Sequence, residues 1–260
     1  MAFETILTAQ DGSAFIITLN RPDRRNAFSV KMMKEIAEAC RGAEADPSVR
    51  AVIITGGTKY FSAGADLNEA MAIKSTSDGV AYLTNWETLN NTIERLDKPV
   101  IAAIEGFCMT GGWEFVMACD IRVCADNSTF ALTSSKIGTV PGAGGTQRLP
   151  REIGIGRALD ILFSGDTIDA QEAYRIGAVN RVFPVGKVLD GAKAMVKVYE
   201  KRAPLSLAYA KRAVRGGMQM DLTSGIEFEK FLVAAIYVTA DRKEGIGAFL
   251  EKREAKFSGS

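Results

Sequence analysis

The stretch that decides the fold is Gly106–Glu114, which reads Gly-Phe-Cys-Met-Thr-Gly-Gly-Trp-Glu and follows the apolar run Val100–Ile104. A short apolar run that ends in glycines predicts a buried strand turning directly into a helix. The first amides of a helix have no intrahelical partner, and the helix dipole adds to their attraction for an anion. Gly111 and Gly112 let a ligand approach those amides, because glycine has no Cβ in the way. The turn therefore offers donors to a developing negative charge.

A second stretch, Phe61–Asp66, reads Phe-Ser-Ala-Gly-Ala-Asp and also follows a strand-like run. It supplies another accessible amide beside Gly64. Either turn alone is typical of tight packing between a strand and a helix. Two such turns in one chain are what an enzyme needs to stabilise an oxyanion, so the pair favours a catalytic function.

Glu114 lies in the first turn of the expected helix, inside the apolar run Trp113–Cys119. An acidic residue at this position can simply stabilise the helix N-terminus. A buried charge is costly, however, unless it is paired or functional. Burial would also raise the pKa of this carboxyl toward the range that suits proton transfer. Together with the neighbouring amides, these arguments favour Glu114 as a catalytic acid or base.

The composition excludes several classes of function. The chain has 260 residues, 47% of them hydrophobic, which is enough for a sizeable core in one or two domains. Its 32 basic and 31 acidic residues give a net charge of +1, so no basic field favours nucleic acid as a partner. No apolar run approaches the roughly 20 residues of a transmembrane helix, and no signal peptide is visible. These features predict a cytoplasmic protein with no membrane partner.

Histidine is absent from the sequence. Its absence excludes Ser-His-Asp and Cys-His nucleophilic machinery and removes the commonest zinc ligand. The cysteines show neither a metal-binding spacing nor a disulfide framework, and they are expected to be free buried thiols: Cys40, Cys108, Cys119 and Cys124. We therefore expect no metal and no separate cofactor. Carboxylates, lysine, tyrosine and cysteine remain as acid–base groups.

The order of the expected elements predicts an α/β fold with parallel strand pairing. Strands are expected near 5–8, 14–19, 52–55, 100–104, 121–125 and 129–132, and helices near 29–41, 76–96, 111–119 and 170–176. Ser29 is expected to cap the first helix. The chain after Pro204 is expected to be helical. We therefore expect a core of residues 1–200 and a helical C-terminal subdomain of residues 201–260, with a frayed end at Phe257–Ser260.

A third glycine-rich segment, Pro141–Leu149, reads Pro-Gly-Ala-Gly-Gly-Thr-Gln-Arg-Leu. It is not a Walker loop, because it lacks the Gly-Lys-Ser/Thr ending. It is not a dinucleotide-binding fingerprint either, because Gln147 occupies the place of the third glycine. A loop that leads into a helix is expected instead, with Arg148 and Arg151 available for contact with an anion.

Several separated motifs resemble the crotonase (enoyl-CoA hydratase/isomerase) family in order and spacing. They are Leu19-Asn-Arg-Pro with Asn26-Ala, Phe61-Ser-Ala-Gly-Ala-Asp, Lys98-Pro-Val-Ile-Ala-Ala, the Gly111-Gly-x-Glu turn, the Pro141–Leu149 segment, Gly165-Asp and the tail from Asp241. The resemblance runs nearly end to end. It implies a spiral of repeated β-β-α units and a C-terminal helical trimerisation region, usually within a hexamer built as a dimer of trimers.

The resemblance also implies an acyl-CoA substrate, in which coenzyme A is part of the substrate. Its thioester oxygen would accept hydrogen bonds from the amides of Ala65 and Gly111. Donors aimed at that oxygen stabilise an enolate by roughly 3–4 kcal/mol each. The residues that the resemblance assigns to the coenzyme A chain and its phosphates are Ala63, Asp66, Leu67 and Lys252.

Hydratases of this family hold and split a water with two glutamates. The first corresponds to Glu114, and Ser134 occupies the place of the second. A serine hydroxyl can hold a water but cannot deliver a proton near neutral pH, and losing a general acid typically costs about 10²–10⁴-fold in rate. Two further departures are Thr110, in place of the usual first glycine of a triple, and Trp113, which either shapes the acyl pocket or packs in the core.

Three functions stay open at this point. Hydration of a 2-enoyl-CoA to a 3-hydroxyacyl-CoA, with Glu114 as the base, is favoured by the hydratase-like sequence of Pro141–Leu149 and of the tail. A single-glutamate isomerase or decarboxylase is favoured by Ser134. An acyl-CoA-binding protein with little catalysis is disfavoured by the two oxyanion turns. The expected partners are an acyl-CoA thioester and further copies of the chain.

Overall fold

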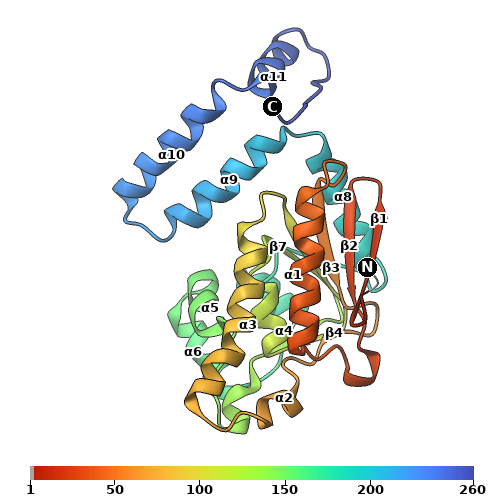
Figure 1. The fold of residues 1–260 in the computed structure, drawn as a ribbon, viewed down its shortest axis with the longest axis vertical. Coiled ribbons are helices and arrows are strands. Elements are labelled where there is room, and N and C mark those ends of the chain that lie inside the picture. Colours follow the sequence, from red (N-terminus) through yellow and green to blue (C-terminus); the bar gives the residue numbers. More distant parts are fainter. Residues whose placement is uncertain (1–2) are drawn as a thin grey trace.

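The computed structural model describes residues 3–260. Figure 1 shows a body of strands covered by helices, and a helical arm at the C-terminal end that projects from the body. We call residues 204–260 the arm; its helices are α9 (Pro204–Gly217), α10 (Leu222–Ile236) and α11 (Ala240–Leu250). Within the described residues, no helix is long and apolar enough to cross a membrane.

The larger of two sheets has six strands. Their order across the sheet is β1 (Ile6–Asp11), β2 (Ala14–Leu19), β3 (Ala51–Thr55), β5 (Val100–Ile104), β7 (Ile121–Ala125) and β10 (Arg181–Phe183). β1 and β2 form an antiparallel hairpin, and every later pair of neighbours is parallel. The predicted parallel pairing is therefore confirmed for this sheet.

The smaller sheet has the order β4 (Tyr60–Ser62), β6 (Phe107–Met109), β8 (Thr129–Ala131) and β9 (Ile168–Asp169). β4, β6 and β8 are parallel, whereas β9 runs antiparallel to β8. Three times, a strand of the larger sheet is followed first by a strand of the smaller sheet and then by a helix. This repeated β-β-α order confirms the spiral that the resemblance implied.

Helices cover both faces of the larger sheet. The helical segments of the body are η1 (Pro22–Arg24), α1 (Val30–Ala45), α2 (Leu67–Met71), α3 (Thr76–Arg95), α4 (Gly111–Val116), η2 (Thr133–Ile137), α5 (Gly145–Ile153), α6 (Ile155–Ser164), α7 (Ala170–Arg175) and α8 (Val188–Glu200). Val52 and Ile54 of β3 pack on the side of α1 and α3, whereas Ile53 packs on the side of α8. Alternate residues of a strand point to opposite faces, so a strand buried on both sides is apolar throughout.

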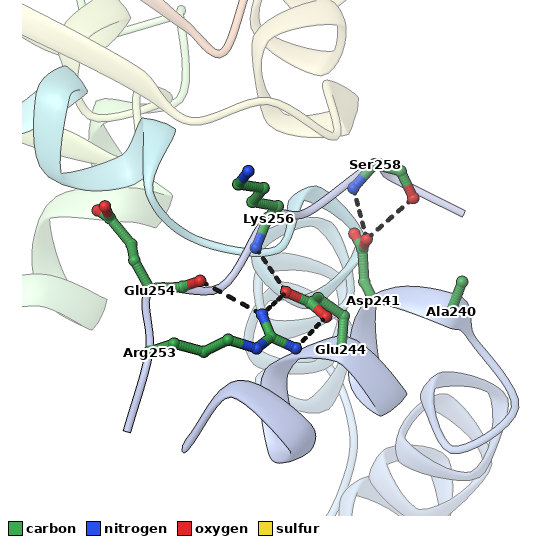
Figure 2. A pocket seen from close by; sticks show the side chains of 7 residues that line it. All are labelled: Ala240, Asp241, Glu244, Arg253, Glu254, Lys256 and Ser258. Atoms are coloured by element: carbon green, nitrogen blue, oxygen red, sulfur yellow. Dashed lines mark hydrogen bonds and ion pairs between the residues drawn. The ribbon is translucent and has the colours of Figure 1, made fainter. Parts of the chain in front are cut away.

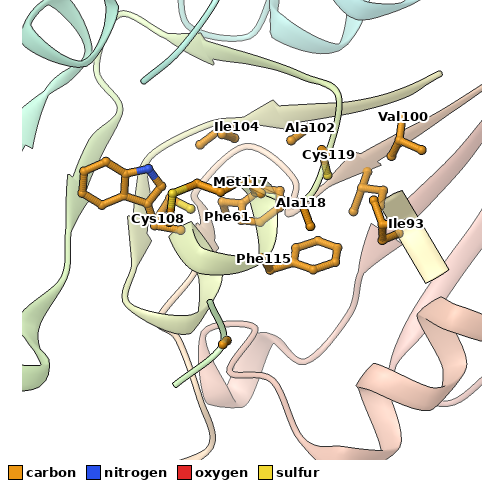
Figure 3. Close-up of a cluster of buried hydrophobic side chains, with 14 of the residues drawn as sticks. Phe61, Ile93, Val100, Ala102, Ile104, Cys108, Phe115, Met117, Ala118 and Cys119 are labelled. Carbon is orange, nitrogen blue, oxygen red and sulfur yellow. The ribbon is translucent and has the colours of Figure 1, made fainter. Parts of the chain in front are cut away.

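The larger core cluster joins the two sheets. Figure 3 shows Ala102 and Ile104 of β5 near Phe61 of β4 and Cys108 of β6, with Val100 of β5 farther away near Ile93, and all of them belong to one cluster. All of these side chains are buried. The four cysteines are free and buried, as the sequence predicts. This shared core fixes the smaller sheet, and with it the turns that follow its strands, against the larger one.

Local sequence signals predict most helix ends correctly. The hydroxyl of Ser29 accepts a hydrogen bond from the amide of Met32 at 3.2 Å, which confirms the expected cap of α1. α4 is shorter than expected and ends at Val116. The next residues continue as a tightened turn, because the amide of Ala118 bonds to the carbonyl of Phe115, three residues back, at 3.0 Å.

The arm is attached to the body through charged side chains. Lys211 of α9 pairs with Asp120 at 2.8 Å, and Arg212 pairs with Asp97 at 2.6 Å. Many large apolar side chains of the arm are exposed: Val214, Met218, Met220, Leu222, Ile226, Phe231, Val233, Tyr237, Val238, Ile246, Phe249 and Leu250. Neither apolar core cluster includes a residue beyond Val196.

The expectation of a frayed end at Phe257–Ser260 is wrong. The buried carboxylate of Asp241 accepts hydrogen bonds from the amide of Ser258 at 2.6 Å and from the amide of Gly259 at 2.9 Å. Figure 2 shows the hydrogen bonds between Ser258 and Asp241 in the pocket between α11 and the tail, where Arg253 also donates two bonds to Glu244. The composition of the last four residues predicts fraying because it contains no information on these bonds. The bonds join the tail to Asp241, a residue far from it in the sequence.

We expect Asp241→Ala to release the tail, because two backbone amides and the Ser258 hydroxyl would lose their charged acceptor. The free energy of unfolding in urea should fall by about 1–3 kcal/mol. Limited proteolysis should also cut the last residues faster than in the parent protein. Glu229→Ala removes an exposed carboxylate on α10, away from the tail contact, and serves as the control. An unchanged cleavage rate in Asp241→Ala would contradict this account of the tail.

Candidate active site

The residues singled out in the sequence follow three neighbouring strands of the smaller sheet. Ala65 comes after β4, Gly111 and Glu114 come after β6, and Ser134 comes after β8. Because β4, β6 and β8 are parallel neighbours, their carboxyl ends lie at the same edge of the sheet. The fold thus brings these four residues, which are up to 69 positions apart, to one edge.

The amides of Ala65 and Gly111 lie beside each other. A Cβ placed on Gly111 would be 3.2 Å from the nitrogen of Ala65. On either side of Ala65 the chain is fixed to Phe28, whose amide donates to Gly64 at 2.7 Å and whose carbonyl accepts from Asp66 at 2.9 Å. Neither the Ala65 amide nor the Gly111 amide donates to an acceptor within residues 3–260. Both donors are therefore left for a ligand atom.

The two turns interlock at Gly64 and Thr110. Gly64 has a φ of +104°, and a Cβ there would overlap the hydroxyl oxygen of Thr110. Thr110 itself has a φ of +41° and a ψ of −117°, a conformation in which glycine is the usual residue. The threonine is thus held in a strained conformation by its packing. The resemblance described above has glycine at this position, so threonine in its place costs conformational free energy.

Glu114 is held by the loop that follows η2. Its side chain is buried, and its Oε1 atom accepts hydrogen bonds from the amides of Ala143 and Gly145, each at 2.8 Å. Burial raises the pKa of the Glu114 carboxyl above its usual range, although both amides and the charge of Arg148 oppose that rise. Its Oε2 atom accepts no hydrogen bond from the described residues. A glutamate that only stabilised the helix N-terminus would not need burial and two amide donors from a distant loop. This arrangement suits a carboxyl that takes up and releases a proton.

The glycine-rich segment serves Glu114 rather than a phosphate. A Cβ on Gly145 would lie 2.9 Å from the Glu114 side chain, so the close approach requires glycine there. Arg148 pairs with Glu94 at 2.7 Å and donates to the carbonyl of Ala143 at 3.1 Å, so its guanidinium is engaged within the protein. Arg151 is exposed and uses one guanidinium nitrogen to donate to the carbonyl of Gln147 at 2.7 Å.

Ser134 lies in the first turn of η2 and is buried. Its carbonyl accepts a hydrogen bond from the amide of Thr139 at 3.0 Å, which closes the turn. Its hydroxyl has no protein partner among residues 3–260. The side chain is therefore free to hold a water, while no second carboxylate occupies this position.

The other predicted site residues have varied surroundings. Asp66 caps α2 and pairs with Arg21 at 2.8 Å. Burial acts to raise the pKa of Asp66, but the hydrogen bonds from Arg21 and the Asn68 amide, together with the charges of Arg21 and Arg24, outweigh burial and lower this pKa. Ala63 is partly buried, and Leu67 and Lys252 are exposed. Trp113 is fully buried and packs on Phe130 with ring centroids 5.5 Å apart, as a core residue does.

Sequence reasoning missed the two amides that hold Glu114. The glycine-rich Pro141–Leu149 segment is similar to a phosphate-binding loop in composition, but its glycines position the amides of Ala143 and Gly145 for the carboxyl. The available signal was the buried carboxylate itself. A charged group in an apolar helix requires donors from elsewhere, and a glycine-rich loop is a common source of free amides.

Comparison with known proteins identifies the family. Residues 9–260 match the family model described as enoyl-CoA hydratase/isomerase. The crotonyl-CoA hydratase of Syntrophomonas wolfei is 38% identical over 258 residues, which is 99% of each chain. The short-chain-enoyl-CoA hydratase of Clostridium acetobutylicum is 36% identical over 255 residues, covering 98% of this chain and 97% of that protein.

The structural comparison agrees with the sequence comparison. A crystal structure of an enoyl-CoA hydratase from Bacillus anthracis matches with a TM-score of 0.94 and 36% identity. That match covers 99% of this chain and 100% of the other. The earlier resemblance is thereby confirmed over the whole length, and the chain belongs to the enoyl-CoA hydratase/isomerase (crotonase) family.

Proposed function

We propose that this protein catalyses the reversible hydration of a 2-enoyl-CoA to a 3-hydroxyacyl-CoA. The observation that carries the proposal is the buried Glu114 carboxyl, which is fixed through one oxygen and has no partner at the other among residues 3–260. It lies at the same sheet edge as two amides that donate to no acceptor within those residues. The names of the relatives from Syntrophomonas wolfei and Clostridium acetobutylicum, both hydratases, support the same reaction. The membership of the family supplies the acyl-CoA substrate class.

In this mechanism the thioester oxygen accepts hydrogen bonds from the amides of Ala65 and Gly111, where the charge of the enolate develops. Glu114 takes a proton from water as the water oxygen bonds to C3. The same proton then passes from Glu114 to C2 of the enolate, and the carboxylate is restored. Ser134 holds the water through its hydroxyl. One carboxyl therefore completes the reaction, with OH added at C3 and H at C2.

A single proton carrier also suits a second function. Double-bond isomerisation moves one proton between two carbons of a CoA enolate, and decarboxylation of a malonyl-type thioester requires one protonation of the enolate that forms. Both reactions use the amides and Glu114 without a second carboxylate. Ser134, in the place of the second glutamate, is the observation that favours them.

Replacing the proton carrier separates an enzyme from a binding protein. We expect Glu114→Gln to lower kcat with crotonyl-CoA by about 10²–10⁴-fold, with a smaller change in KM, because the amide cannot accept the proton. Loss of the conjugated thioester absorbance, with the product mass increased by one water, measures the rate. Glu105→Gln, at another buried glutamate that accepts a backbone amide bond, is the control and should keep its activity. Equal rates in Glu114→Gln and the parent protein would exclude the proposed role.

Restoring the second carboxylate distinguishes the two reactions. In a hydratase we expect Ser134→Glu to raise kcat for hydration, by up to about 10²-fold, because a second acid–base group shares the proton transfer. A dedicated isomerase or decarboxylase should gain no hydration. Ser134→Gln, which has a similar size and no ionisable group, controls for changes in packing. Parallel assays with 3-enoyl-CoA and malonyl-CoA would show which reaction the parent protein prefers.

We also propose that the arm, as part of residues 201–260, assembles the chain into trimers or into a dimer of trimers. The support is the row of exposed apolar side chains on its helices, which a single chain leaves uncovered. In such an assembly Lys252 would contact a phosphate of coenzyme A, while Ala63, Asp66 and Leu67 line the acyl-CoA chain. Trp113 would support the acyl pocket from the core.

We expect Phe231→Asp to shift the assembly toward monomers, because Phe231 is 75% exposed on α10 within the proposed interface. Light scattering during size-exclusion chromatography measures the mass directly. Leu7→Asp, at a residue 55% exposed on β1 of the body, is the control and should leave the mass unchanged. A parent protein that is already monomeric at micromolar concentration would refute the assembly.

The cysteines suggest a compartment. All four are free and buried, and proteins of reducing compartments keep their thiols in this state. We therefore propose the cytoplasm as the site of action.

A further inference from the structure

Both backbone polar groups of Ala143 are hydrogen-bonded. Its amide donates to Oε1 of Glu114, and its carbonyl accepts from Nδ2 of Asn90 at 2.8 Å and from a guanidinium nitrogen of Arg148 at 3.1 Å. Asn90 is buried on α3, and Arg148 belongs to α5. Because a peptide unit is planar, holding the Ala143 carbonyl fixes the peptide plane between Ala143 and Gly144. This plane lies between the two amides that donate to Glu114, those of Ala143 and Gly145, so Asn90 and Arg148 restrain the loop at the point between its two donors.

Arg148 is in turn connected to the arm. Its Nε atom donates to Oε1 of Glu94 at 2.7 Å, and the same oxygen pairs with Arg215 at 3.3 Å. Arg215 lies on α9 and also binds Asp120 at 2.9 Å and the carbonyl of Ala118 at 2.7 Å. A continuous chain of polar contacts therefore runs from α9 through Glu94 and Arg148 to the loop that holds Glu114.

We propose that Arg148 and Arg215 are positioning residues for Glu114, through which the arm helps to set the orientation and charge state of that carboxyl. This inference rests on the proposed function, in which Glu114 moves the proton. The charged members of the chain are only partly exposed, so solvent and salt screen them less than free surface charges. A residue of the arm thereby acts on the site without touching substrate.

The charges around Glu114 give the direction of the effect. Arg148 of α5 acts to lower the pKa of Glu114, and Tyr82 of α3 faces it as a neutral phenol whose pKa is raised, mainly by burial. The strands β4 and β6, which pack against α4, contribute no carboxylate, lysine or arginine. Removing the charge of Arg148 therefore raises the pKa of Glu114 further. Since Glu114 acts as a base when ionised, the acid limb of the activity profile moves to higher pH.

Loss of Arg215 acts in the same direction with a smaller effect. Without Arg215, the carboxylate of Glu94 pairs with Arg148 alone and cancels more of its charge at Glu114. The loop also loses its connection to α9, which loosens the amides that lower the pKa of Glu114. Arg212 provides a matched control one turn away on the same helix, because it pairs with Asp97, outside this chain of contacts.

The experiment compares Arg148→Met, Arg148→Lys, Arg215→Met and Arg212→Met in the full chain. We measure kcat/KM for crotonyl-CoA against pH, and the carboxyl titration of Glu114 by ¹³C NMR without substrate, assigned with Glu114→Gln. The ratio of kcat/KM at neutral pH to that on the acid limb should rise about three- to tenfold in Arg148→Met. It should rise less in Arg215→Met and in Arg148→Lys, which keeps the charge, and stay at the parent value in Arg212→Met.

Two outcomes would overturn the inference. One is an unchanged Glu114 titration in both Arg148→Met and Arg215→Met, at a thermal stability close to that of the parent. The other is an equal change in Arg215→Met and Arg212→Met, which would show only general loosening of α9. The NMR titration needs no turnover. Absence of hydration in the parent protein would therefore refute the proposed function while leaving this test of the contacts intact.

Discussion

The two hydrogen bonds from Ala143 and Gly145 to Oε1 of Glu114 are the interaction on which the rest of the site depends. A carboxyl in an apolar helix needs donors, and neutral amides satisfy one oxygen without neutralising the group as a buried lysine or arginine would. For these amides to arrive, β8 must lie beside β6 and the glycine-rich loop must return over α4. The order of the smaller sheet and the start of α5 at Gly145 follow from that requirement.

The oxyanion turns show a second constraint, which is steric rather than electrostatic. The amides of Ala65 and Gly111 can lie side by side only if the two turns approach closely, and Gly64 and Gly111 leave room for that approach. Thr110 occupies a strained conformation at the same contact. The strained residue lies beside the two amide donors and not at Glu114. Different residues therefore fix the backbone geometry of the amides and the position of the Glu114 carboxyl.

Local patterns predicted much of the fold, because strands buried on both faces and capped helices carry their own signals. Ser29, the run Val100–Ile104 and the glycine turns gave correct elements, and the sequence predicted the burial of Glu114. Contacts between distant segments had no such signal. The adjacency of β4, β6 and β8, the docking of the tail on Asp241 and the pairing of Arg148 with Glu94 depend on tertiary packing. A periodicity of one segment contains no information on which other segment will satisfy its polar groups.

The arm has a thermodynamic consequence of its own. Both apolar clusters end by Val196, and α9 is joined to the body mainly by ion pairs. Its apolar side chains therefore contribute little to the folding free energy of an isolated chain. In the proposed assembly partner chains would cover these side chains, so the stability of the arm would depend on protein concentration and, through its ion pairs, on salt.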